Sequence, residues 1–98
     1  MIYRIELTAD AERDLVRLAD FLAERSESAA RRAGRDIKAA LRSLARMPAR
    51  ARRTSDDLHE FAIRFGQSGY VVQFRVRDDT VVIARIYHMR EDRRGLDE

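Results

Sequence analysis

The spacing of hydrophobic residues changes once along the chain. Between Ala9 and Leu44 they recur every three or four positions, and between Leu58 and His88 they largely alternate with polar residues. The first spacing is typical of amphipathic helices, and the second is typical of strands with one face against a core. The pattern therefore predicts a helical first half and a sheet-forming second half.

Two helices are predicted in the first half. The first runs from about Ala9 to Arg25, behind Thr8, whose hydroxyl can cap the first turn. The second follows Ser28 as its cap and ends near Pro48, which disfavours helical geometry in the preceding residue. Gly34 weakens this helix by about 1 kcal/mol relative to alanine, so a close helix crossing is expected there. The link between the helices is very short, so they should pack antiparallel. The two hydrophobic stripes are Ala11, Leu15, Leu18 and Leu22, with Phe21 beside them, and Ala30, Ala33, Ile37, Leu41 and Leu44.

Four strands are predicted around these helices. A short one spans Ile2–Leu7 at the start of the chain. The others are Leu58–Phe65, Tyr70–Arg77 and Thr80–His88. Gly66 and Gly69 supply the chemistry of one hairpin turn, and Asp78-Asp79 that of the other. The stretch from Ala49 to Asp57 has no periodicity and is expected to be a polar, arginine-rich connector.

The strand pattern also predicts how the sheet is layered. Phe61 and Ile63 alternate with polar residues, whereas Thr80–His88 is apolar on both faces, as expected in the middle of a sheet. We therefore predict an α+β fold with the order β-α-α-β-β-β, in which a helical hairpin packs on an antiparallel sheet. It forms one domain over residues 1–98, with a charged tail over about 89–98.

Composition narrows the class of protein. With 98 residues and 45% hydrophobic residues, the chain can build only one compact core. It has no cysteine, which rules out disulfides and thiolate metal sites and favours a reducing cytoplasm. We expect no signal peptide, membrane span, metal or cofactor.

Arginine dominates the charged residues. The 20 basic and 17 acidic residues give a net charge of +3, and Lys38 is the only lysine. Four arginines recur on the predicted strands, namely Arg64, Arg75, Arg77 and Arg85. They either form a surface for an acidic partner or a solvated sheet face paired with Glu60 or Asp79. Arg50, Arg52 and Arg53 in the connector either bind nucleic acid or an acidic antitoxin segment, or belong to a solvated loop.

His88 is the candidate for proton transfer. Its unperturbed pKa lies near neutrality, and it ends the last predicted strand beside Arg90 and Glu91. The alternative is a half-buried histidine that is hydrogen-bonded to the backbone at the edge of the sheet. We favour this structural role over the catalytic one.

The order of these features resembles the RelE/ParE superfamily of bacterial type II toxins. The resemblance rests on a strand, a helical hairpin, a basic connector and a meander with Ser68-Gly69-Tyr70 opening its middle strand and His88 closing its last. The segments LTADAERDLVRLADFL and RIYHMRED resemble the ParE branch. The resemblance implies a toxin that a cognate antitoxin masks and, for the ParE branch, inhibition of DNA gyrase rather than enzymatic activity.

The RelE branch implies a different activity, ribosome-dependent and metal-independent cleavage of messenger RNA. Such nucleases use basic side chains on the sheet to stabilise the reacting phosphate. Arg64 and Arg90 match that role and His88 is the candidate proton donor, whereas Ala62 and Val71 stand where basic residues often occur in these nucleases. The candidate contacts for a target or an antitoxin are Arg64, Arg75, Arg77, Arg85, Tyr87 and Arg90.

Overall fold

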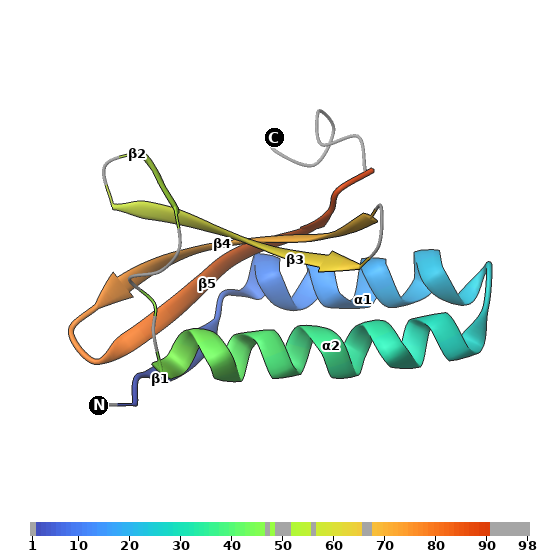
Figure 1. Cartoon of the computed structure of the whole chain (residues 1–98), viewed down its shortest axis with the longest axis horizontal. Coiled ribbons are helices and arrows are strands. Elements are labelled where there is room, and N and C mark those ends of the chain that lie inside the picture. Colours follow the sequence, from blue (N-terminus) through green and yellow to red (C-terminus); the bar gives the residue numbers. More distant parts are fainter. Residues whose placement is uncertain (1, 47, 49–51, 56, 66–67, 91–98) are drawn as a thin grey trace.

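The computed structural model describes residues 2–46, 48, 52–55, 57–65 and 68–90. Two helices form a layer against one face of a sheet, which confirms the predicted α+β class (Figure 1). The elements in chain order are β1 (Arg4–Leu7), α1 (Ala9–Ala23), α2 (Glu27–Arg46), β2 (Arg52–Ser55), β3 (Leu58–Phe65), β4 (Ser68–Arg77) and β5 (Thr80–His88).

The sheet has five strands in the order β1-β5-β4-β3-β2. β5 lies between β1 and β4, as its apolar faces predicted, and it pairs parallel with β1 and antiparallel with β4. The connector prediction was wrong for Arg52–Ser55, which pairs antiparallel with β3. A four-residue edge strand needs only backbone partners, so it requires no hydrophobic alternation.

The N-terminal cap of α1 was predicted correctly from the sequence, and that of α2 was not. The Ala11 N–H donates to Thr8 Oγ1 at 3.1 Å, which confirms Thr8 as the cap of α1. The predicted cap of α2 was wrong, because the Ala29 N–H donates to Ser26 Oγ at 3.2 Å and the helix already begins at Glu27. Both serines can cap, but only the earlier one leaves Glu27 in the first turn, where the helix dipole favours an anion.

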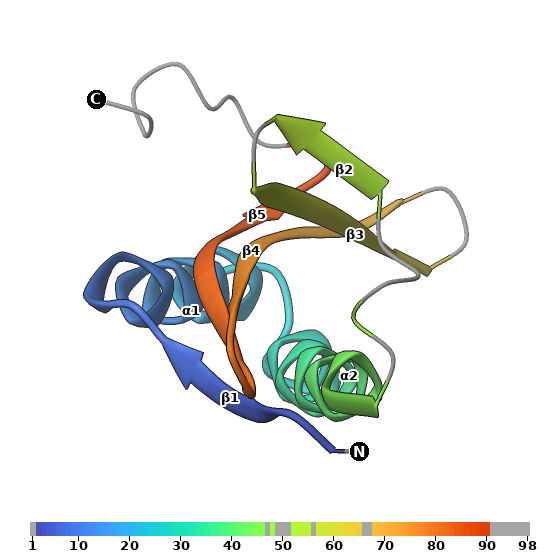
Figure 2. The same ribbon diagram turned by 90° about the vertical axis from the view of Figure 1, so that its left-hand side faces the viewer.

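The core lies between the helical layer and the covered face of the sheet (Figure 2). Its members from the helices and the sheet are Ala11, Leu18, Ala33, Ile37, Leu41, Leu44, Ile63, Tyr70, Val72, Phe74, Val81, Ile83 and Ile86. Gly34 does not mark a close crossing as predicted, since a Cβ built there has no heavy atom within 4 Å.

Two of the described residues at or near the predicted hairpin turns have positive φ. Asp78, between β4 and β5, has φ 54°, a conformation that aspartate tolerates better than most residues. Gly69 lies inside β4 with φ 156°, and a Cβ there would sit 2.0 Å from the Ile63 carbonyl oxygen. Only glycine fits at this position. Gly66 lies outside the described residues.

Candidate functional site

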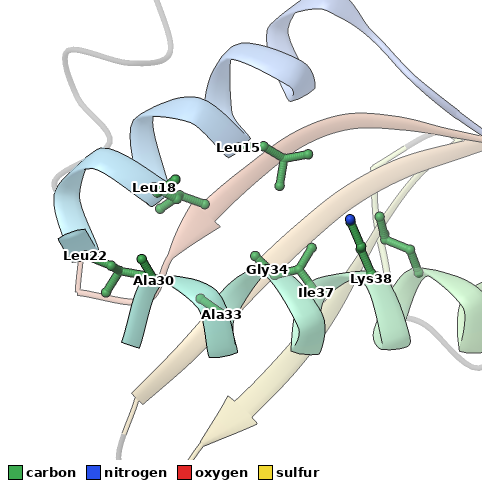
Figure 3. Close-up of a pocket in the computed structure, with 10 residues that line it drawn as sticks. Leu15, Leu18, Leu22, Ala30, Ala33, Gly34, Ile37 and Lys38 are labelled. Carbon is green, nitrogen blue, oxygen red and sulfur yellow. The ribbon is translucent and has the colours of Figure 1, made fainter. Parts of the chain in front are cut away.

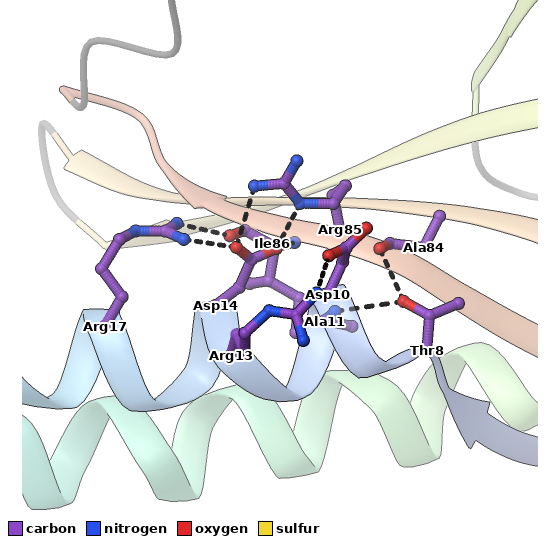
Figure 4. A network of polar contacts seen from close by, with 9 residues as sticks. All are labelled: Thr8, Asp10, Ala11, Arg13, Asp14, Arg17, Ala84, Arg85 and Ile86. Carbon is purple, nitrogen blue, oxygen red and sulfur yellow. Dashed lines mark hydrogen bonds and ion pairs between the residues drawn. The ribbon is translucent and has the colours of Figure 1, made fainter. Parts of the chain in front are cut away.

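Helix α1 follows β1 in the chain and lies along the part of β5 with which β1 does not pair. β1 pairs with β5 only as far as Ile83, and the register between β4 and β5 shifts at the next residue. Beyond it, Thr8 Oγ1 donates to the Ala84 carbonyl at 2.9 Å, and the Ile86 N–H donates to Asp14 Oδ2 at 2.8 Å (Figure 4). Arg17 Nη2 donates to the Ile86 carbonyl at 3.1 Å. Side chains of α1 therefore satisfy the backbone groups that a longer β1 would have paired.

Asp14 is the centre of this contact. It is 1% exposed and is the only buried charged residue in the described part of the chain. Arg85 donates to its carboxylate through Nε at 2.8 Å and Nη2 at 3.0 Å, and Arg17 forms a second ion pair. The clamp formed by Asp14, Arg17 and Arg85 joins residues 71 positions apart in the chain.

The clamp shifts the ionisation of its members. Burial by itself would raise the pKa of Asp14, but the hydrogen bonds from Arg85, the Ile86 N–H and Arg17 together hold that pKa below its usual range. The hydrogen bond to Asp14 raises the pKa of Arg85 in turn. The sequence analysis did not single out Asp14. The available signal was a carboxylate between Ala11 and Leu18 on the hydrophobic side of α1.

The four strand arginines do not form one open patch. Asp14 binds Arg85, whose guanidinium carbon also lies 4.9 Å from the centre of the Tyr87 ring. Asp57 binds two more of the four, with Arg75 Nε at 3.2 Å and Arg77 as a second ion pair. These pairs lower the pKa of Asp57, through the Arg77 hydrogen bond first. The expected partners, Glu60 and Asp79, instead accept hydrogen bonds from Gln73 and Thr80.

Arg64 and Arg90 lie together at one end of the sheet. Arg64 is opposite Gly69 in the register of β3 and β4, and the Met89 N–H donates to the Gly69 carbonyl at 2.9 Å. Both arginines are exposed, and neither forms an ion pair within the described part of the chain.

A row of uncharged residues crosses the sheet next to this end. Ala62 is directly opposite Val71, and Val71 is directly opposite Tyr87. None of the three belongs to the core beneath the helices, although Val71 and Tyr87 are buried. Alternation along β3 places Arg64 on the same face as Ala62. The outer face of the sheet therefore carries three uncharged side chains beside Arg64.

His88 lies on the opposite side of the sheet from Arg64. Its ring contacts Tyr70 edge-on at 5.4 Å and Phe21 at 5.9 Å, both measured between ring centres. Its Nδ1 accepts the Arg90 N–H at 3.1 Å. These contacts correspond to the structural role expected for a half-buried histidine.

An apolar groove runs between the two helices. It encloses about 180 Å³, and Figure 3 shows Lys38 among the residues that line it. Ala19 and Lys38 are its exposed members and therefore mark its mouth. Its walls are Leu15, Leu18, Ala19, Leu22, Ala30, Ala33, Gly34, Ile37, Lys38 and Leu41. A second hollow, of about 220 Å³, lies where α2 meets Tyr70 at the start of β4.

Other kinds of site find no support in the described residues. They contain no group of three or more histidine, aspartate or glutamate side chains arranged to hold a metal ion. Neither α1 nor α2 is long and apolar enough to span a membrane. Arg50 lies outside the described residues.

The fold and this arrangement define a small toxin of the RelE/ParE class, and comparisons with known proteins identify the family. Residues 5–93 match the family described as the ParE toxin of type II toxin-antitoxin systems, parDE, and the chain belongs to that family. It is 39% identical over 93 residues to toxin RelE1 of Caulobacter vibrioides, covering 95% of this chain and all of the relative. It is 44% identical over 89 residues to toxin RelE3 of the same organism, covering 91% of this chain and 97% of the relative. The fold is shared with a chain of the chromosomal ParDE system from P. aeruginosa, with a TM-score of 0.68 and 22% identity over 88% of this chain and 95% of that one.

Proposed function

We propose that this toxin acts in the bacterial cytoplasm, that it arrests growth by inhibiting DNA gyrase, and that a cognate antitoxin neutralises it by direct binding. The relatives carry both ParE and RelE names. The target must therefore be argued from the residues of this chain.

The choice between a protein target and RNA rests on the row of Ala62, Val71 and Tyr87. A nuclease of this fold must stabilise the charge that develops on the reacting phosphate, and preorganised cations are the usual means. The row offers no cation, and Arg75, Arg77 and Arg85 are already bound to carboxylates. A protein target has no such requirement, because interface cores are depleted in charge and enriched in aromatic residues and arginine.

The groove between α1 and α2 supports the antitoxin part of the proposal. Its walls are apolar over two helices, which suits the apolar face of an amphipathic helix. Ala19→Glu places a carboxylate at the mouth of the groove and should weaken antitoxin binding at least tenfold in calorimetry. Ala9→Glu on the same helix lies outside the groove and is the matched control. Equal affinity of both variants and the wild type would exclude the groove as the docking site.

RNA cleavage is the second candidate, and one observation favours it. Arg64 and Arg90 are exposed without ion pairs at the same end of the sheet, where two cations could hold a phosphate. His88 lies on the other side, so in this alternative Arg64 and Arg90 provide the charge, and His88 contributes only if its ring leaves Tyr70 and Phe21.

Expression of the chain without antitoxin separates the two targets. Loss of gyrase supercoiling with intact transcripts supports our proposal, and cuts at fixed codon positions support the nuclease. If the chain cleaves RNA, Arg64→Ala and Arg90→Ala should each abolish cleavage and preserve antitoxin binding. Arg13→Ala, an exposed arginine on α1, serves as the control. Normal growth of cells that contain the folded, antitoxin-free chain would contradict both functions.

A further inference from the structure

The outer face of α2 carries a basic stripe that the fold does not use, and of its members only Lys38 also lines the proposed groove. Its members are Arg31, Arg35, Lys38, Arg42 and Arg46, and all five are exposed. Their spacing of three or four residues puts them on one side of the helix. The buried residues of α2, among them Ile37 and Leu41, lie on another side, against α1 and the sheet.

The stripe has little internal neutralisation. Asp36 lies near it, in the hollow that Arg35, Lys38 and Arg42 also line. Glu27 is the carboxylate that pairs with the stripe, with Oε2 3.9 Å from Arg31 Nη1, and both side chains are largely exposed. A pair this open contributes little. Arg35, Lys38, Arg42 and Arg46 have no ion pair within the described ranges. Four or five like charges therefore face solvent along a rigid rod.

The dimensions of the stripe fit a line of phosphates. At 1.5 Å per residue, the distance from Arg31 to Arg46 is about 22 Å, in steps of about 4.5 to 6 Å. Duplex DNA carries one charge per 1.7 Å of axis, so about 13 phosphates lie along the same length. Arginine suits this contact because its planar fork donates two hydrogen bonds to one phosphate.

The surroundings of the stripe exclude other polyanionic partners. A helix that binds membranes must insert its apolar face, but the apolar face of α2 is already packed in the core. An acidic protein interface needs an apolar centre, and the hollow along this face contains only Ala39 as an uncharged residue. Single-stranded nucleic acid is bound through aromatic stacking, and α2 has no aromatic residue.

We propose that the basic stripe of α2 binds the phosphate backbone of duplex DNA without sequence preference. The choice of DNA over duplex RNA rests on the proposed function, because gyrase acts on DNA; the choice of a duplex backbone rests on the stripe alone. Bound in this way, the toxin is concentrated along the substrate of its target.

Fluorescence anisotropy of the full chain with a labelled 20-base-pair DNA duplex tests the proposal. Five phosphate contacts give a slope of about −4.5 for log affinity against log salt, since each contact contributes about 0.9. The triple variant Arg35→Gln, Arg42→Gln and Arg46→Gln leaves Lys38 of the groove unchanged. It should lose about 2.7 of that slope and at least tenfold in affinity at 0.1 M salt. The control removes the same charge elsewhere, by Arg4→Gln, Arg13→Gln and Arg25→Gln, and should keep most of the slope.

Several outcomes would overturn the proposal. Equal affinity of the triple variant and the wild type excludes the stripe, and equal losses in the triple variant and the control reduce the effect to net charge. Tighter binding to anionic vesicles or to a polyglutamate peptide would assign the surface to another partner. Equal or tighter binding of duplex RNA would overturn the choice of DNA. The assay contains no gyrase, so its failure is separate from a failure to inhibit supercoiling.

Discussion

Removal of the buried Asp14 carboxylate should destabilise the protein more than removal of any charge on its surface. Asp14 accepts hydrogen bonds from Arg85, Arg17 and the Ile86 N–H. Asp14→Ala leaves all three without this partner, and the side chains of Arg85 and Arg17 are only 20% and 26% exposed. Loss of one partner from a buried ion pair typically costs about 3 to 5 kcal/mol.

That cost is large compared with the stability of a domain of this size. A chain of 98 residues is typically stable by about 5 to 15 kcal/mol. At about 4 to 8 °C per kcal/mol, the unfolding midpoint should fall by at least about 12 °C. Asp14→Asn keeps one acceptor for the Ile86 N–H but loses the charge, so its loss should be smaller than that of Asp14→Ala.

Urea unfolding followed by circular dichroism measures these changes in the free energy of unfolding. Asp10→Ala is the matched control, because Asp10 is an exposed aspartate on the same helix with its own arginine partner, Arg13. It should cost no more than about 1 kcal/mol. A loss below about 1 kcal/mol for Asp14→Ala would refute the reasoning. In a double-mutant cycle with Arg85→Ala, a coupling near zero would show that the two side chains stabilise the fold independently.

Three further predictions follow from single residues. Because the pKa of Asp14 is lowered in the folded state, its ionisation stabilises the fold fully above the unfolded pKa of about 3.9, and this stabilisation is lost as pH falls through the folded pKa. A plot of unfolding free energy against pH should therefore be flatter below about pH 4 in Asp14→Asn, and an unchanged profile would contradict this. Gly34→Ala should stabilise the free toxin by about 1 kcal/mol in thermal unfolding, since its Cβ meets only open space, and a loss of stability would show that the helices cross more closely. Gly69→Ala should cost at least about 2 kcal/mol by the same measurement, because its Cβ would overlap the Ile63 carbonyl, and a neutral effect would contradict the backbone conformation at this position.

The spacing of hydrophobic residues and the turn residues predicted those strands whose ends are marked in their own sequence. The bounds of β3 and β5 agree with the sequence analysis because strand-forming residues end at turn residues on both sides of each strand. β2 was missed because an edge strand is defined by its partner, and its own residues have no alternation. Gly34 was misinterpreted because a glycine in a helix can face either a close neighbour or an open groove, and only the packing decides.

The sequence indicated on which strands the candidate residues lie but not which carboxylates bind them. Seven candidate residues lie on β3, β4 and β5 or just after them, as the alternation indicated. Asp57 and Asp14 are the carboxylates that bind Arg75, Arg77 and Arg85. They come from other parts of the chain, and the spacing of residues along one strand does not indicate them. A carboxylate inside a hydrophobic stripe is the one local sign of such a pair, because an ionised group is buried only with a partner.

The distribution of unpaired charge bears on the target more than the number of arginines does. On the outer face of the sheet, carboxylates bind Arg75, Arg77 and Arg85, and these arginines serve largely to hold elements together. Four cations without an ion pair in the described part of the chain, Arg35, Lys38, Arg42 and Arg46, lie in the stripe on α2, whereas Arg64 and Arg90 are exposed at one end of the sheet. A nuclease needs its cations at the reacting phosphate, whereas a toxin that holds a protein and DNA together can carry them on a separate surface. Combined loss of gyrase inhibition and DNA binding in the stripe variant, with antitoxin affinity unchanged, would link the two surfaces in one mechanism.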